Sequence, residues 1–191
     1  MKIKIGFFSV LLCVTLLVFE RQLALAALLS IALHEFGHFA AARICGIQIS
    51  EFKTGIYGAR ISASYELFSY KDEIFLCVMG PLVNFILALA LLPVYSATKN
   101  QFILNVIASS LFLGILNLLP IKGFDGGRIF LSLLNIFCPH EIASKIISAV
   151  SFCIIFILWS TSVFLLIVAN AGLSAFVFSL SLFSSIFNDR F

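Results

Sequence analysis

Long apolar runs alternate with short polar stretches along the whole chain. Windows of about 20 apolar residues, the length that crosses a bilayer as a helix, predict spans at residues 5–19, 22–43, 74–96, 101–119, 145–169 and 171–187. The two largest stretches outside these spans are residues 44–73 and 120–144. The pattern predicts an all-α polytopic membrane protein with about six transmembrane helices, formed as one domain over residues 1–191.

Two alternatives to this division stay open. The first span is short and follows Lys2 and Lys4, so it also fits a cleavable signal peptide. Cleavage after Ala24-Leu25-Ala26 would cut into the second span, which argues against that alternative. The fifth and sixth spans meet at residues 169–172 and also fit one long broken helix.

Composition places this chain in lipid. Hydrophobic residues make up 62% of it and charged residues 11%, whereas soluble domains carry about a quarter charged residues. The net charge of +3 is too small to indicate a nucleic-acid partner. The five cysteines form no CxxC pair, so they predict neither a disulfide framework nor a thiolate metal site.

The basic residues predict the orientation. With the N-terminus inside, ten of the twelve Lys and Arg residues fall on one side of the membrane, leaving Arg21 and Lys99 on the other. The side with the excess is cytoplasmic. Residues 44–73 and 120–144 are then expected to face the cytoplasm.

The second span contains His34-Glu35-Phe36-Gly37-His38, an HExxH motif. Positions four apart on a helix differ by about 400°, so the two imidazoles point within about 40° of each other and can bind one ion. Glu35 is set about 100° away, where a carboxylate can act as general base on a metal-bound water. Ionisable groups inside a span are costly, by roughly 2.5 kcal/mol or more each, and a bound divalent ion would compensate them.

Catalytic zinc takes three protein ligands and keeps one open position, so a third donor is required. The pair His140-Glu141 is one candidate, but Ser144 stands where a second histidine would be needed. Asp125 is the other, after Pro120 and before Gly126 and Gly127. The second and fourth predicted spans run in the same direction, so the cytoplasmic half of the one and the end of the other can meet. Topology therefore favours Asp125, although Asp-Gly-Gly after a proline is also a common turn.

Residues 47–61 alternate partly between apolar and polar side chains, with Gly55 and Gly58 as turn points. This pattern fits a small membrane-associated β-hairpin, whose exposed edge could pair with an extended substrate. A plain cytoplasmic linker is the alternative.

Three motifs in order resemble the site-2 protease family of intramembrane zinc metalloproteases, and most closely its stage IV sporulation protein FB type. They are His34-Glu35-x-x-His38, Gly80-Pro81-x-x-Asn84, and Asn117-x-x-Pro120 followed by Asp125-Gly126. The resemblance covers about residues 25–130, around a core of residues 22–130. It implies one Zn2+ per chain on His34, His38 and Asp125, with Glu35 as the catalytic acid and base. Many relatives carry a PDZ or CBS domain, for which this chain has no room.

The resemblance further implies that Asn84, Asn117 and Pro120 lie near the substrate. Asn84 would donate a hydrogen bond to the developing oxyanion; an interhelical hydrogen bond is the alternative for this side chain. The implied activity is hydrolysis of a membrane-anchored protein, such as a pro-sigma factor, within or near its transmembrane segment. The expected setting is a bacterial cytoplasmic or forespore membrane, with the site open to the cytoplasm and a regulatory membrane protein as partner.

Two other functions use the same residues. A membrane metal-binding protein or transporter would not need Glu35 as an acid and base, and would show polar groups on several spans. A metalloprotease of another membrane family would take a glutamate, here Glu141, as third ligand. Whether Asp125 or Glu141 is the third ligand distinguishes that family from the site-2 protease family.

Overall fold

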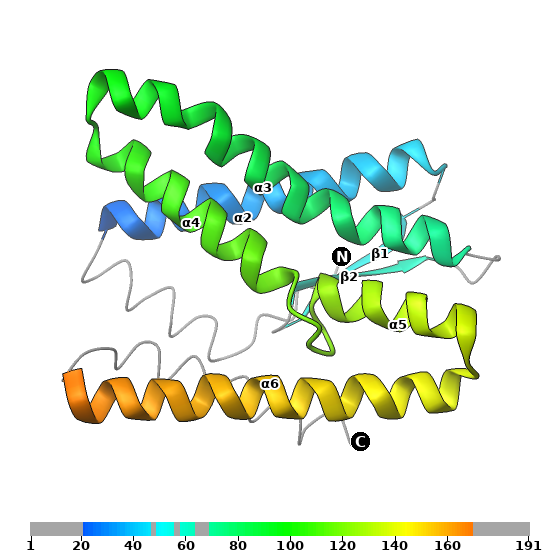
Figure 1. Cartoon of the computed structure of the whole chain (residues 1–191). Helices are drawn as coiled ribbons and strands as arrows, with labels where there is room; N and C mark the ends of the chain where they lie inside the picture. The colour runs from blue at the N-terminus through cyan, green and yellow to red at the C-terminus, as the bar shows by residue number, and fades with distance from the viewer. Residues whose placement is uncertain (1–20, 47–48, 56–57, 64–68, 170–191) are drawn as a thin grey trace.

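The computed structural model describes residues 21–46, 49–55, 58–63 and 69–169. The predicted spans 5–19 and 171–187 lie outside these residues, so the count of six stays a prediction. Figure 1 shows the described elements, which are α2 (Arg21–Ile44), β1 (Ile49–Gly55), β2 (Gly58–Ala63), α3 (Tyr70–Thr98), α4 (Gln101–Asn117), α5 (Asp125–Phe137) and α6 (His140–Ala169).

Within the described part of the chain, three helices have the length and apolar composition needed to cross a membrane. They are α2, α3 and the His140–Phe164 part of α6. The predicted spans 22–43, 74–96 and 145–169 fall in these helices, which confirms them as helical. The predicted span 101–119 coincides with α4, which is apolar but has 17 residues. A helix of that length is at the lower limit for crossing a bilayer.

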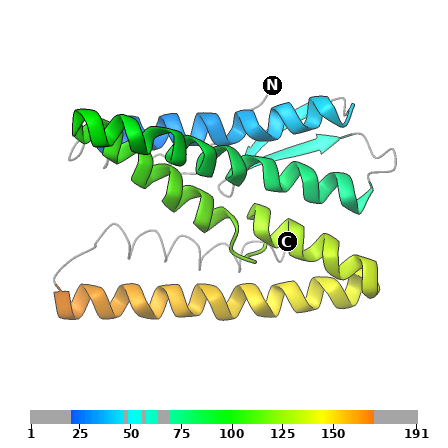
Figure 2. The same ribbon diagram turned by 45° about the horizontal axis from the view of Figure 1, so that its top comes forward.

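Helix α5 connects a group of three helices, α2, α3 and α4, to helix α6. Helices α2, α3 and α4 pack against one another, and α5 packs on both α3 and α6. Figure 2 shows α4 and α5 between the α2–α3 pair and α6. Figure 1 shows α5 continuing beyond α4 in roughly the same direction after residues 118–124. Span four is thus followed by a second helix, where the sequence had suggested a turn.

In the group of α2, α3 and α4, many small residues are buried and many large apolar residues are exposed, the reverse of the arrangement in a soluble protein. The buried face of α2 carries small residues such as Ala26, Ser30 and Ala41, so its neighbours can approach closely. Ser30 on α2 and Ser110 on α4 share a buried hydrogen bond of 2.9 Å between their hydroxyl oxygens. Large apolar side chains lie outside instead, as at Leu89, which is 70% exposed. Such a surface is stable in lipid.

The loop between α4 and α5 is fixed on both sides. Ile121 and Phe124 pack with Ile155 of α6 in one buried cluster, and the Lys122 amide donates to the Ser151 hydroxyl at 2.7 Å. On the other side, a Cβ at Gly126 would collide with the carbonyl group of Leu118. The first turn of α5 therefore packs directly on the backbone of the loop.

Glycine has two separate uses in this segment. Gly123, with a φ of 100°, takes the backbone conformation that side chains disfavour and so makes the turn. Gly126 and Gly127 lie in the first turn of α5, where a Cβ on either residue would meet a carbonyl oxygen of the loop. The Asp-Gly-Gly sequence is the start of a closely packed helix, so the alternative of an ordinary turn is wrong.

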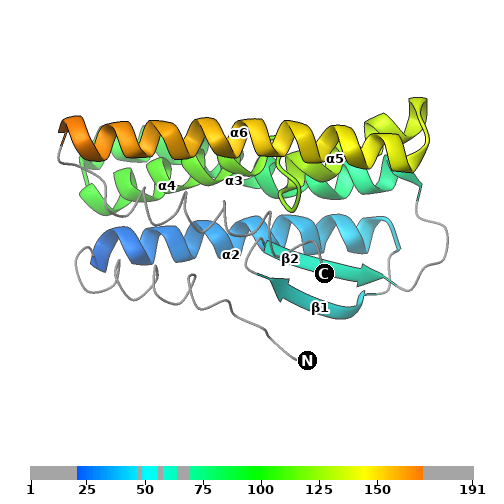
Figure 3. The ribbon, with the colours of Figure 1, turned by 90° about the horizontal axis from the view of Figure 1, so that it is seen from below.

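Strands β1 and β2 pair antiparallel in the segment where the sequence suggests a hairpin. Gly55 lies opposite Gly58 at one end of the register, and a β-bulge interrupts it between Ile49 and Glu51. Figure 3 shows the two strands alongside the carboxyl-terminal half of α2, the half that carries the histidine motif. Their role in binding an extended chain stays a prediction.

Replacing Gly126 with alanine should destabilise the protein because the new methyl group would displace backbone rather than a flexible side chain. We expect the free energy of unfolding to fall by about 1–3 kcal/mol, measured by thermal denaturation of the purified chain in detergent. Asn135→Ala serves as the control on the same helix, since Asn135 contacts the exposed His140 ring. Equal stability of Gly126→Ala and the control would contradict the close packing of this loop.

Candidate metal centre

The two motif histidines lie one turn apart on the buried face of α2. Their exposed fractions are 4% for His34 and 6% for His38, and their ring centroids are 4.8 Å apart. The Nε2 atoms of the two rings are separated by 3.1 Å. The helix therefore delivers both imidazole nitrogens to one point, as the four-residue spacing predicts.

Asp125 brings the third donor from the first turn of α5. Its Oδ2 atom lies 3.0 Å from Nε2 of His34 and 3.2 Å from Nε2 of His38. A carboxylate in the first turn also suits the positive end of the α5 dipole. Among the described residues, His34, His38 and Asp125 form the one group of metal-ligand side chains with its donor atoms within 4.8 Å of one another.

The spacing of these donors fits a small divalent ion. Ligand atoms at zinc's bond lengths of about 2.0–2.1 Å occupy a tetrahedron whose edges are about 3.3 Å long. The three donor separations of 3.0, 3.1 and 3.2 Å are close to that edge. Two imidazoles and one carboxylate, with a fourth position left open, form a donor set typical of catalytic zinc.

A hydrogen bond to the Leu76 carbonyl determines which nitrogen of His38 carries the proton. Its Nδ1 atom lies 2.8 Å from the carbonyl oxygen of Leu76 on α3. A carbonyl can only accept, so Nδ1 carries the proton and donates it. In the neutral ring Nε2 then has a free lone pair, directed toward His34 and Asp125.

Asn84 occupies the corresponding place beside His34. It is completely buried on α3, and its Nδ2 lies 3.1 Å from Nδ1 of His34. In the described part of the chain, its Oδ1 atom has no hydrogen-bond partner. Asn84 therefore makes an interhelical hydrogen bond, the alternative that its place in a span had suggested.

Gly80 forms the wall of the site on the α3 side. A Cβ at this position would lie 2.8 Å from Nε2 of His34 and would collide with the His38 ring. Gly37 of α2 has the complementary role, because a Cβ there would lie 2.6 Å from the carbonyl oxygen of Met79. The two glycines allow the α3 backbone to lie directly against the imidazoles.

The other predicted residues are arranged around this group. Glu35 is half-buried beside His34 on α2 and lies outside the set of three donors, as expected of a base. Asn117 ends α4 and Pro120 follows in the loop. Asn117 has no hydrogen bond to either histidine or to Asp125 in the described structure, and its place near a substrate stays a prediction. Glu141 is exposed in the first turn of α6 and does not belong to the group of donors.

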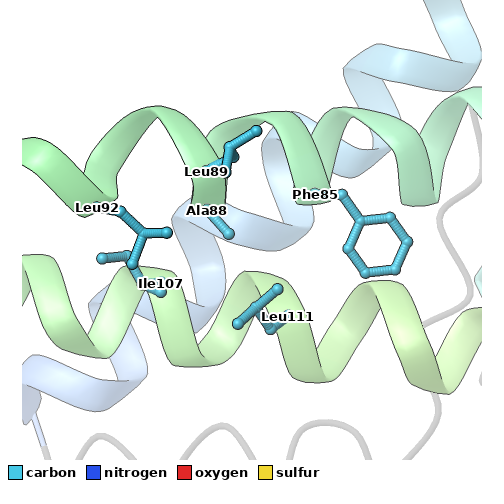
Figure 4. A pocket seen from close by; sticks show the side chains of 6 residues that line it. All are labelled: Phe85, Ala88, Leu89, Leu92, Ile107 and Leu111. Carbon is cyan, nitrogen blue, oxygen red and sulfur yellow. The ribbon is translucent and has the colours of Figure 1, made fainter.

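A cavity outside the candidate metal centre is lined by apolar side chains. It has a volume of about 260 Å³ and lies between α3 and α4. Figure 4 shows the six residues that line it, which are Phe85, Ala88, Leu89, Leu92, Ile107 and Leu111. None of them carries a polar side-chain group, so this cavity contains no candidate metal ligand.

The Leu76 carbonyl is a functional group that the sequence does not reveal. A backbone carbonyl exists at every position, and only the packing of α3 on α2 brings this one to the His38 ring. The sequence shows Gly80 only as part of the Gly80-Pro81-x-x-Asn84 motif. A glycine next to a proline in a span indicates a close contact, but it does not identify the partner.

Comparison with known proteins shows which peptidase family the chain matches. Residues 22–109 and 94–158 match peptidase family M50. A curated zinc metalloprotease of Methanocaldococcus jannaschii is 31% identical over 123 residues, which are 62% of this chain and 36% of that relative. The chain thus matches about a third of the relative's length. The solved site-2 protease from the same organism has a similar fold, with a TM-score of 0.70 at 21% identity, covering 97% of this chain and 89% of that one.

Replacing Gly80 with alanine should weaken zinc binding by about tenfold or more, because the methyl group would push the imidazoles apart. The measurement is zinc affinity of the purified chain by competition with a chelating dye. Gly114→Ala is the matched control, since its Cβ would meet the movable Phe85 ring at 3.1 Å. Unchanged affinity in Gly80→Ala would show that α3 does not position the histidines.

Proposed function

The chain belongs to peptidase family M50, and we propose that it is an integral membrane zinc endopeptidase that cuts membrane-anchored proteins within or near their transmembrane segments. The observation that carries this proposal is the group of two buried imidazoles and one partly buried carboxylate, with donor atoms all within 4.8 Å of one another. This donor set would hold one zinc ion per chain on His34, His38 and Asp125.

A zinc ion bound there would supply a Lewis acid that lowers the pKa of a water ligand to about 7 and polarises a carbonyl group. His38 would hold the ion through Nε2, because the Leu76 carbonyl accepts the proton on Nδ1. Glu35, about 100° around the helix from His34, takes the proton from the attacking water and returns it to the leaving amine. Gly80 leaves no side chain between the α3 backbone and the two imidazoles.

Asn84 is the hydrogen-bond partner of Nδ1 of His34, as the Leu76 carbonyl is of Nδ1 of His38. For His34 to bind zinc through Nε2, its Nδ1 atom must carry a proton and needs an acceptor. The Asn84 amide lies at that atom, and turning it about its last side-chain bond brings Oδ1 into place. This orientation also gives the buried Oδ1 atom a donor, which supports the role.

The substrate must expose its backbone, because helical hydrogen bonds cover the peptide groups. The two-stranded sheet of β1 and β2 has free edges within the described residues, and it lies beside the half of α2 that carries the motif. We propose that an unwound substrate pairs with one of these edges and extends toward the zinc site. The excess of Lys and Arg on one side of the predicted spans favours a site that opens to the cytoplasm.

The nature of the substrate follows from resemblance. The interval from Asn117-x-x-Pro120 to Asp125 is similar to that of the sporulation branch, which favours a membrane-tethered pro-sigma factor and control by a second membrane protein. A bacterial cytoplasmic or forespore membrane is the corresponding location. The proposal of a peptidase does not depend on this finer assignment.

Glu35→Gln should abolish cleavage while keeping zinc, because glutamine has the same shape but cannot take the proton. Cleavage of co-expressed, tagged candidate membrane proteins should fall by at least about 10²-fold, measured by the appearance of the shorter product. Glu141→Gln, at an exposed residue of α6, is the control and should cleave normally. A metal transporter would bind zinc without cleaving any candidate, and persistent cleavage in Glu35→Gln would disprove the mechanism.

Asn84→Leu should weaken zinc binding by about 10–100-fold, because His34 loses its acceptor while the side-chain volume is nearly kept. Asn84→Asp retains an oxygen toward Nδ1 and should bind zinc close to the wild-type level. Both are measured by chelator competition on the purified chain. If Asn84→Leu keeps its zinc affinity and loses turnover, Asn84 is an oxyanion donor instead of the His34 partner.

A further inference from the structure

A second polar cluster joins α3 to α5 outside the metal centre. The Glu73 carboxylate in the first turn of α3 accepts from Arg128 Nε at 3.4 Å, from Arg128 Nη2 at 3.3 Å and from Ser132 Oγ at 2.7 Å. We call Glu73, Arg128 and Ser132 the α3–α5 clamp. Its donors come from one helix and its acceptor from another, 55 and 59 residues away in sequence.

The clamp lies on the same stripe of α5 as the third zinc ligand. Asp125, Arg128 and Ser132 are spaced three and four residues apart, so they share one face of the helix. That face is turned toward α3, because Arg128 and Ser132 both bond Glu73. A rotation of α5 about its axis would break these bonds and move the Asp125 carboxylate at the same time.

Helix α3 also packs on both helices that carry the proposed ligands. The histidines are on α2, which packs on α3, and Asp125 is on α5, which packs on α3 as well. Leu76 lies one turn after Glu73 and accepts from His38 at 2.8 Å. The first turns of α3 therefore hold one histidine by a carbonyl and the aspartate helix by a carboxylate.

The setting makes these bonds stronger than those of an ordinary surface pair. Arg128 and Glu73 side chains are 30% and 33% exposed, and Ser132 is 1% exposed. Partial burial lowers screening by water, and two donors from different residues fix the carboxylate in orientation. The loop before α5 fixes where the helix starts, whereas the clamp fixes how it is turned.

We propose that Glu73, Arg128 and Ser132 are positioning residues that hold the Asp125 carboxylate at the two imidazoles and so determine zinc affinity. This inference rests on the proposed ligand set of His34, His38 and Asp125. The clamp residues act through Asp125 and do not touch the ion themselves.

The test measures zinc affinity by chelator competition on the purified full chain, in the wild-type background and in an Asp125→Ala background. Glu73→Gln removes the charge that holds Arg128, and Ser132→Ala is the milder variant that removes one bond. Asp72→Asn is the matched control, because it removes a carboxylate from the same turn of α3. Circular dichroism checks that helix content is equal in all variants.

We expect Glu73→Gln to weaken zinc binding by about tenfold or more in the wild-type background, with a smaller loss in Ser132→Ala and none in Asp72→Asn. In the Asp125→Ala background neither clamp variant should cause any further loss, because the ligand that they position is already absent.

Two results would overturn the clamp alone. One is wild-type zinc affinity in Glu73→Gln and Ser132→Ala; the other is an equal loss in both backgrounds, which would mean that these residues support the fold without acting on Asp125. If Asp125→Ala by itself leaves affinity unchanged, the proposed ligand set fails and the clamp fails with it.

Discussion

The contact of the α3 backbone with two imidazoles of α2 is the constraint on which the metal centre depends. Gly80 lies so close to the rings of His34 and His38 that no side chain fits between them. A helix backbone is rigid compared with a side chain, so it fixes the rings from one side without moving itself. The Asp125 carboxylate reaches the Nε2 atoms of the same two rings from α5.

One stripe of α3 supplies the supports of the centre. Glu73, Leu76, Gly80 and Asn84 follow each other at intervals of three or four residues, so they lie on a single helical face. The Glu73 carboxylate accepts from Ser132 of α5, and the Leu76 carbonyl lies at Nδ1 of His38. The Gly80 backbone lies against both imidazoles, and the Asn84 amide lies at Nδ1 of His34. Zinc sites require such outer partners because they set the tautomer and the angle of each ligand.

The sequence predicted the donors better than it predicted what holds them. Four-residue spacing predicts that His34 and His38 converge, and the direction of the spans brought Asp125 to them. Both arguments use periodicities that a single chain reveals. The helices α2, α3 and α6 were found in the same way, from runs of apolar residues.

Helix α5 was missed because its start carries two glycines, which usually indicate a turn. The apolar residues after Arg128 follow a helical period and could have revealed it. Gly126 is explained only by the carbonyl group that it packs on, and that contact depends on the tertiary structure. The bonds from Glu73 to α5 cross more than fifty residues and leave no local pattern.

X-ray absorption at the zinc edge of the purified chain in lipid shows directly whether His34, His38 and Asp125 bind a zinc ion. We expect one zinc per chain with nitrogen and oxygen donors at about 2.0–2.2 Å, including two imidazoles, and no sulfur. Thiolate donors at about 2.3 Å, or a chain that retains no zinc, would disprove the proposed metal centre.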